Sequence, residues 1–323
     1  TMEKKYDLVA VGEVLIDMTE TGKTETGSSV FEANPGGAPA NVAVAASKLG
    51  AKAAFIGRTG PDPLGEGLRE VLEASGVDVS GMSVDKAVPT TIAMVSLDEN
   101  GERDFTFLRN PGADITLSPE HLPREMIESA KILHFGSVSL TAEPERSATL
   151  AAVEIAKQAG NLISYDPNYR PPLWPDEKTA VAEMKAAVPL CDILKVSDEE
   201  MFLLSGSGNL SQGSAALTEM GPFLVLITLG ADGVFYRMGA STGHISGRQV
   251  TVADTNGAGD TFFGAVLCEL AKLPDPEKVT VPELEKILRF ANYAASVTTS
   301  RSGAIPAMPG RQEVEELLAE AGK

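Results

Sequence analysis

One stretch of the sequence places an acidic side chain beside a glycine-rich turn. The seven residues DTNGAGD at positions 254–260 follow an alternating apolar segment at 250–253, which we predict to be a strand, and precede apolar residues at helical spacing. Gly257 and Gly259 let successive backbone N–H groups point into one concavity at the start of a helix, where the helix dipole favours an anion. Asp260 could then take a proton from a hydroxyl group that attacks a phosphate, or it could merely cap the helix.

Other glycine-rich stretches give weaker evidence for phosphate binding. Residues 22–24, Gly-Lys-Thr, look like the end of a P-loop, but the position five residues before Gly22 is Asp17, where that motif requires glycine. No G-x-G-x-x-G opens a helix after a strand, so a dinucleotide-binding fold is not predicted. The loop Thr228–Gly233 ends the most apolar strand, and it could either hold a ligand or be a simple turn.

Three cationic residues are candidates for contact with phosphate or substrate. Arg109 and Arg170 could close over a substrate or contact its phosphate, or each could be an ordinary surface arginine. Lys195 ends an apolar segment and could reach the rim of the same anion site. Because the chain has no Ser-His-Asp arrangement with a nucleophile elbow and no cluster of His or Cys, serine-hydrolase and His/Cys-metal chemistry are not predicted.

The elements that must position these residues follow an alternating pattern. Short β-branched segments alternate with segments of helical periodicity, which is typical of a parallel sheet covered on both faces. The predicted strands are residues 8–11, 53–56, 132–135, 162–165, 193–195 and 224–228. The predicted helices are residues 39–49, 64–75, 145–159, 180–187, 259–270, 281–298 and 312–321.

Two segments interrupt the alternation and predict a small β lid. Residues 13–33 change between polar and apolar in short steps, and residues 90–108 have the pattern of a hairpin. In the hairpin, Ile92–Leu97 and Arg103–Leu108 flank an Asn-Gly pair, which favours a tight turn. We expect the lid to comprise 13–33 and 90–108, and the α/β body to comprise 1–12, 34–89 and 109–323. Pro35 and Pro111, each beside glycine, are candidate hinges.

The composition of the chain excludes several classes of function. With 323 residues, of which 43% are hydrophobic, the chain can build a large core. Its formal net charge of −18 disfavours binding to nucleic acid or to anionic membranes, so any phosphate must be held by local donors. Cys191 and Cys268 are isolated in apolar surroundings, and we predict reduced core thiols. With no long apolar run and a charged start at residues 3–7, we expect a cytoplasmic protein.

Three motifs together resemble those of the ribokinase-like carbohydrate kinases, often called the PfkB family. Residues 254–260 resemble its C-terminal pattern, NPGGAPANVA at 34–43 its N-terminal pattern, and Gly60-x-Asp62-x-x-Gly65 its short internal one. The order and separation of the motifs fit, and the resemblance covers essentially the whole chain. It implies an α/β fold, a three-layer α/β/α sandwich with a small β-strand lid, and the transfer of a phosphoryl group from ATP to a sugar.

The resemblance also assigns roles to particular positions. It implies that Asp260 is the catalytic base and that three backbone groups form the anion hole, those of Gly257, Ala258 and Gly259. The residues placed with the sugar are Asp17, Gly36, Gly37, Asn41 and Asn168, with Arg109 and Arg170 as further candidates. Those placed with the nucleotide are Thr228, Gly230, Gly233 and Asn292, with Lys195 as a further candidate.

Two metal ions are implied as well. Glu200 ends a variant of the family's Asn-x-x-Glu motif, which is associated with magnesium and phosphate, and Ser197 here replaces the Asn. Asp254 and residues 300–307 resemble the family's potassium site.

The substrate and the assembly are the last expectations. The stretches at 107–114, 134–140, 164–175 and 195–200 most resemble members that phosphorylate the 6-hydroxyl of fructose. Ribose and 2-keto-3-deoxygluconate remain alternative substrates, and a sugar sensor without turnover remains an alternative function. Because lid strands would leave unpaired edges, we expect two lids to pair in a homodimer.

Overall fold

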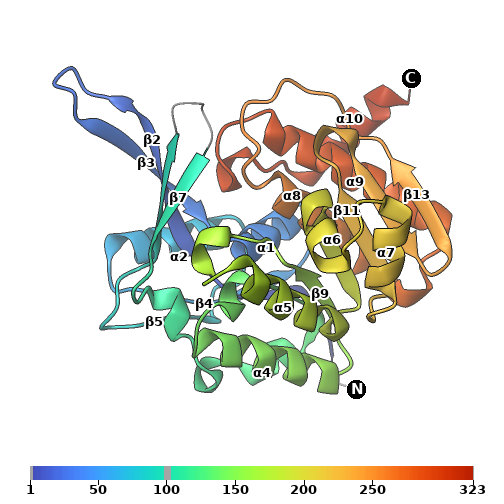
Figure 1. The fold of residues 1–323 in the computed structure, drawn as a ribbon, viewed down its shortest axis with the longest axis horizontal. Coiled ribbons are helices and arrows are strands. Elements are labelled where there is room, and N and C mark those ends of the chain that lie inside the picture. The colour runs from blue at the N-terminus through green and yellow to red at the C-terminus, as the bar shows by residue number, and fades with distance from the viewer. Residues whose placement is uncertain (1–2, 98–102, 323) are drawn as a thin grey trace.

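A computed structural model describes residues 3–97 and 103–322, and its centre is a large sheet (Figure 1). Neighbouring strands of this sheet are parallel, except that β12 runs antiparallel to both β11 and β13. In spatial order its nine described strands are β13 (Ser241–Ile245), β12 (Val234–Met238), β11 (Leu224–Thr228), β10 (Ile193–Ser197), β9 (Leu162–Asp166), β8 (Ala130–Gly136), β1 (Tyr6–Val11), β4 (Ala53–Thr59) and β5 (Met82–Val84).

Helices cover both faces of this sheet because its strands are apolar on both faces. Successive residues of β1 point in opposite directions: Val9 and Val11 join one core, and Leu8 and Ala10 join the cores on the other face. The first core is closed by α3 (Arg124–Glu128), α4 (Glu145–Gln158), α5 (Glu177–Ala187), α6 (Asp198–Ser205) and α7 (Leu210–Thr218). The opposite face is covered by α1 (Ala38–Lys48), α2 (Pro63–Ala74), α8 (Ala258–Leu270), α9 (Val281–Thr299) and α10 (Arg311–Ala321). The three-layer sandwich is therefore confirmed.

A second, small sheet projects from the sandwich at the upper left of Figure 1. Its order is β3 (Ser29–Gly36), β2 (Leu15–Lys23), β6 (Ile92–Leu97) and β7 (Arg103–Leu108), with β2 and β6 parallel and the other pairs antiparallel. The predicted hairpin strands match β6 and β7, and the predicted Asn100-Gly101 turn lies outside the described residues. Pro35 pairs with Ile16 inside β3, so this position belongs to a strand and not to a hinge loop.

The prediction of a strand at residues 250–253 is wrong, because this segment is an irregular loop. The backbone N–H groups of Ala253 and Asp254 both donate to the carbonyl oxygen of Thr299, at 2.9 and 3.2 Å, instead of pairing with a strand. Val252 is 58% exposed. The segment is therefore a loop that the C-terminal end of α9 holds in place, and its Val250 and Val252 line a pocket together with residues of α9.

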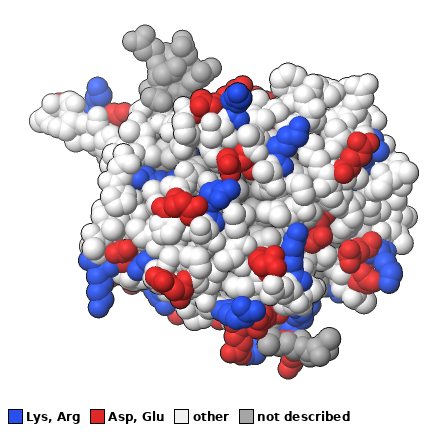
Figure 2. All heavy atoms as spheres, turned by 60° about the horizontal axis from the view of Figure 1, so that its bottom comes forward, with Lys and Arg blue, Asp and Glu red and all other residues white. Residues whose placement is uncertain are grey.

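The remaining expectations about the core and surface can be compared with the fold. Cys191 and Cys268 are buried and form no disulfide, as predicted. Over the face shown in Figure 2, acidic and basic side chains are interspersed, so the excess negative charge is not concentrated into one patch there. Within residues 3–97 and 103–322, every helix is too short or too polar to cross a bilayer.

Candidate active site

The candidate site lies where the carboxyl ends of the parallel strands face α8 and the small sheet. Asp166 ends β9 and Ser197 ends β10, while Thr228 ends the adjacent β11. Carboxyl ends of parallel strands are the usual position of ligand sites in such sheets. A small pocket at this edge is lined by residues of the small sheet, of α1, of α8 and of the loop after β9, among them Asp17, Asn41, Phe105, Asn168, Arg170 and Asp260.

The anion nest was predicted at the turn before α8 (Ala258–Leu270). Gly257 is the N-cap residue and has a left-handed backbone with φ of 73°, which glycine adopts without strain. Within the described residues no side chain caps this helix. The N–H of Ala258 donates to the carbonyl oxygen of Thr255, at 3.3 Å, whereas those of Gly259 and Asp260 lie in the first turn, where the helix itself offers no acceptor to an N–H group. A β-carbon at Gly259 would lie 3.0 Å from Lys195 Nζ, which shows how closely that cation approaches the nest.

Asp260 does not cap the helix; its carboxylate points to another element. Asn41 Nδ2, from α1, donates a hydrogen bond of 2.9 Å to Asp260 Oδ2. Burial, together with the negative charge of Asp166, raises the pKa of Asp260 to about 6, against the opposing effects of Asn41, Lys195 and Arg170. A carboxylate with a pKa near 6 is both ionised at neutral pH and basic enough to accept a proton from a hydroxyl group.

A buried ion pair lies beside the nest. Lys195 Nζ is 2.9 Å from Asp166 Oδ2, and both side chains are almost fully buried. Although burial alone would lower the pKa of Lys195, the nearby carboxylates raise it, so the ammonium stays charged. Lys195 therefore places a fixed positive charge at the rim, in agreement with the sequence prediction of its position.

Glu200 braces the loop that follows β9. Its carboxylate accepts hydrogen bonds of 2.8 Å from the N–H groups of Tyr169 and Ser197, and Ser197 forms a capping box with it at the start of α6. Replacement of the motif's Asn by Ser197 is thus accommodated by ordinary helix capping. Because Glu200 holds Tyr169, it fixes the neighbouring Asn168 and Arg170, and Asn168 has an unusual positive φ of 46°.

The residues placed with the sugar by the resemblance meet in space. Asp17 on β2 pairs with Asn34 on β3, and a β-carbon at Gly36 would overlap the Asp17 carboxylate. Gly37, with φ of 105°, packs against the backbone at Glu13 and immediately precedes α1, which supplies Asn41. Strands β2 and β7 of the small sheet and the first turn of α1 therefore converge on one pocket.

A second pocket, of about 430 Å³, extends from the nest along α9. The four residues predicted for the nucleotide line it together with Ala258 and Gly259: Thr228, Gly230, Gly233 and Asn292. Asn292 Nδ2 donates to the carbonyl oxygens of Ile245 and Ser246, at 3.0 and 3.1 Å, and so holds the segment after β13 in place. Arg248 and Gln249 also line this pocket, and the sequence analysis did not identify them.

Asp254 connects the nest to the C-terminal loop. Its Oδ1 accepts from the N–H of Asn256, at 2.9 Å, and its Oδ2 accepts from the N–H of Gly303, at 3.1 Å. The two segments predicted for a potassium site are therefore adjacent. A carboxylate among loop carbonyl groups is a suitable donor set for a hard cation.

Arg109 was predicted as a possible contact of the substrate, but the structure places it outside the sugar pocket. Its Nε donates to Asp114, its Nη2 to Glu145 and its Nη1 to Thr141, at 2.7–2.8 Å, and the residue is only 7% exposed. All of its nitrogens are thus engaged by the protein, and it does not line the pocket that holds Asp260. The sequence could not show this because two of its partners lie more than 30 residues away.

Glu13 lines the pocket and was missed by the sequence analysis. Its Oε1 accepts a hydrogen bond of 3.1 Å from the N–H of Ala38, and the residue is 2% exposed. Burial raises the pKa of Glu13 to about 8. An acidic residue between two apolar strand segments was the only available signal in the sequence.

The glycine-rich start of α8, the carboxyl group of Asp260 beside it and two adjoining pockets are the arrangement expected of an enzyme that transfers a phosphoryl group to a small hydroxylated substrate. The sequence profile of the pfkB family of carbohydrate kinases matches residues 5–311, and the chain belongs to that family.

Several proteins similar to this chain are fructokinases. Probable fructokinase-2 of Arabidopsis thaliana is 45% identical over 321 residues, covering 98% of this chain and 97% of the relative. Fructokinase of Xylella fastidiosa with bound ATP superposes with a TM-score of 0.91 at 31% identity, covering 98% of this chain and 99% of the other. A double-mutant fructokinase of Vibrio cholerae O395, bound to fructose, ADP and potassium ion, has a TM-score of 0.86 at 33% identity, with 96% and 98% covered.

Proposed function

We propose that this carbohydrate kinase transfers the γ-phosphoryl group of ATP to the 6-hydroxyl of fructose, with Asp260 as the general base. The observation that supports this most is the position of Asp260, partly buried in the first turn of a helix without a side-chain cap among the described residues and oriented by Asn41 at 2.9 Å. The fructokinases among its relatives, one with bound fructose and ADP and one with bound ATP, support the choice of substrates.

In this mechanism the sugar binds between the small sheet and the body. The Asp17 carboxylate accepts hydrogen bonds from sugar hydroxyl groups, and the absence of side chains at Gly36 and Gly37 allows the sugar to approach the backbone closely. The 6-hydroxyl points to Asp260, which removes its proton as the oxygen attacks the γ-phosphorus. Although the pKa of Asp260 is raised to about 6, its carboxyl group is still mainly ionised at neutral pH, and the ionised form is the one that accepts a proton.

The nucleotide binds in the pocket along α9, with its γ-phosphate at the nest. Backbone N–H groups at the start of α8 stabilise the charge that develops on the transferred group, and Lys195 adds a cation that is already positioned by Asp166. These local donors offset the repulsion that a chain of net charge −18 would otherwise exert on ATP. Magnesium, when bound with the nucleotide, would neutralise part of the phosphate charge. Glu200 is the carboxylate that we propose to act with this ion, because it ends the variant of the Asn-x-x-Glu motif.

Potassium is the second proposed cation. Asp254 already connects the nest to the loop at Gly303, so a cation held there by Asp254 and loop carbonyl groups would stiffen the turn that forms the anion site.

Closure of the small sheet, that is of β3, β2, β6 and β7, excludes water that would otherwise hydrolyse ATP. Arg170 supports this step, because its guanidinium carbon lies 6.0 Å from the centre of the Phe105 ring on β7. Arg170 thereby connects the loop after β9 with the moving sheet.

A kinase for 2-keto-3-deoxygluconate is the second candidate, and Arg170 is the reason. A carboxylate substrate requires a cation in the sugar pocket, and Arg170 lines that pocket, whereas Arg109 is engaged elsewhere. Asp17 in the same pocket would repel such a substrate, which favours a neutral sugar.

An ADP-release assay with fructose, ribose and 2-keto-3-deoxygluconate tests the proposal. We expect fructose to give the highest kcat/KM. A higher value for either other sugar changes the substrate, and no turnover with any sugar supports a sensor instead of a kinase.

A further inference from the structure

The small sheet joins the body at four points, and all four are connected to buried polar groups. Glu13 precedes β2, Ala38 follows β3, Thr91 precedes β6 and Arg109 follows β7. Glu13 Oε1 accepts from the N–H of Ala38, at 3.1 Å. Thr91 Oγ1 donates to Asp114, which also accepts from Arg109 Nε at 2.8 Å.

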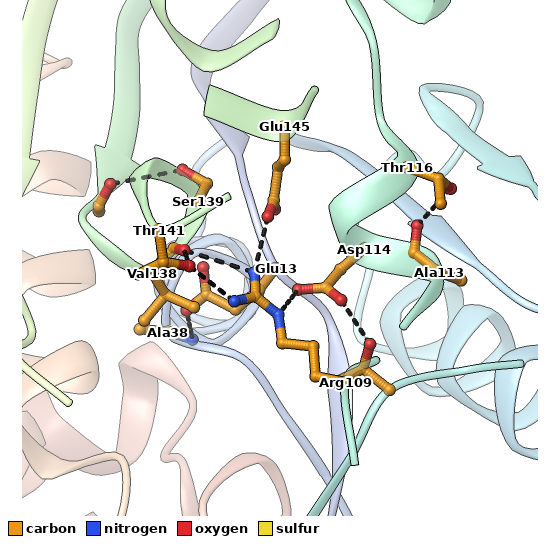
Figure 3. Close-up of polar contacts among 12 residues, drawn as sticks. Glu13, Ala38, Arg109, Ala113, Asp114, Thr116, Val138, Ser139, Thr141 and Glu145 are labelled. Atoms are coloured by element: carbon orange, nitrogen blue, oxygen red, sulfur yellow. Dashed lines mark hydrogen bonds and ion pairs between the residues drawn. The ribbon is translucent and has the colours of Figure 1, made fainter. Parts of the chain in front are cut away.

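Arg109 connects these joining points to the body (Figure 3). Its guanidinium donates to Glu145 at the start of α4 and to Thr141, each at 2.7 Å, and to the carbonyl oxygen of Val138 at 3.4 Å. Arg109, Asp114 and Glu145 are at most 7% exposed. Water therefore has little access to replace any lost bond, and each bond fixes the position of a joining point.

We propose that Glu13, Thr91, Arg109, Asp114 and Glu145 form a buried hinge that sets the position of the small sheet over the sugar pocket. The inference rests on the proposed function, since it assumes that this pocket binds the substrate. Its members are positioning residues: they act through Asp17, four residues beyond Glu13 on β2, and through Asn41, three residues beyond Ala38 on α1.

The charges in the hinge make Arg109 its central member. Asp114 and Glu145 form ion pairs with the Arg109 guanidinium, and the charge of Glu13 also acts on it. Glu13 Oε2 and Glu145 Oε1 are buried without a hydrogen-bond partner in the described part of the chain. Burial raises the pKa of both glutamates, of Glu13 to about 8, so a protonated carboxyl relieves the excess negative charge.

The test compares variants that loosen the hinge with a matched control. Thr91→Val removes the hydroxyl that bonds Asp114, and Arg109→Lys keeps the charge but removes the planar fork. Thr149→Val is the control, because Thr149 is equally buried on α4 and its hydroxyl has no partner among the described residues. We expect the fructose KM to rise roughly tenfold in both hinge variants, the scale of one buried hydrogen bond, while the ATP KM and the control stay unchanged.

Amide hydrogen exchange without substrate provides a readout that does not depend on the reaction. We expect faster exchange at residues 13–17 and 36–41 in Thr91→Val and Arg109→Lys than in the wild type and in Thr149→Val. Unchanged exchange in those segments, or faster exchange with an unchanged fructose KM, overturns the hinge. If wild-type protein does not phosphorylate fructose, the proposed function fails, whereas the exchange rates still decide whether the hinge exists.

Discussion

Replacing Asp260 by Asn is expected to lower the catalytic rate and, at the same time, to raise the stability of the folded protein. The amide has the same shape and can still accept the hydrogen bond from Asn41, but it cannot take the hydroxyl proton. We expect kcat to fall by about 10²–10⁴-fold, the scale of a positioned general base. Fructose affinity should be retained, because the sugar-binding segments around Asp17 and Asn41 are unchanged.

The same substitution should stabilise the fold at neutral pH. Since the pKa of Asp260 is raised from 3.8 to about 6, the folded state binds its proton more tightly than the unfolded state does. The wild type therefore loses stability as pH rises from about 4 to about 6, and the loss is complete above that range. A shift of this size corresponds to about 3 kcal/mol, which Asp260→Asn avoids.

Two measurements test this reasoning. Single-turnover and steady-state rates give the loss of activity, and urea unfolding at pH 8 and pH 4 gives the stability difference, which should be present at pH 8 and absent at pH 4. Near wild-type turnover would mean that Asp260 is not the base. If Asp260→Asn is less stable than the wild type at pH 8, the ionised carboxylate of Asp260 does not destabilise the folded protein and this reasoning is refuted.

Four further results are expected. The kcat/KM of the wild type should fall about tenfold per pH unit below pH 6, because the base must be ionised; a flat profile from pH 5 to pH 7 contradicts this. Replacing potassium by sodium at constant ionic strength should lower the rate, whereas equal rates exclude the cation at Asp254. Fructose should exceed ribose and 2-keto-3-deoxygluconate in kcat/KM by about 10²-fold, since the wrong sugar leaves buried polar groups unpaired. Phe31, which is 40% exposed, lies on the edge strand β3. If two small sheets pair in a homodimer, Phe31→Asp should give monomers by light scattering, and an unchanged mass would place any dimer contact elsewhere.

Local patterns in the sequence were sufficient for most elements of the sandwich. The strand predicted at 224–228 has the same bounds as β11, and the helix at 145–159 ends one residue beyond α4. Such elements depend on periodicity and on residues within one or two turns, both of which are visible in the chain. The helix α6 was missed although its start has a Ser-x-x-Glu capping box at Ser197, a signal that the sequence did contain.

The segment at 250–253 shows why local patterns can also fail. Its alternation is typical of a strand, but a strand needs a neighbour, and the nearest acceptor for its N–H groups is the last turn of α9. Arg109 shows the same effect for a side chain, because its partners Thr141 and Glu145 come from a different layer of the fold. In both cases a contact between distant segments outweighed the local preference.

By itself, the sequence determined the alternation of strands and helices, the hairpin of the small sheet and the glycine-rich turn that ends in Asp260. These features follow from residue type and spacing over a few positions. Only the tertiary structure decided that Asp260 bonds Asn41, 219 residues away, and so is a base candidate instead of a helix cap. It also decided that Arg109 lies behind the pocket and not in it, because burial and ion pairing depend on which segments the fold brings together.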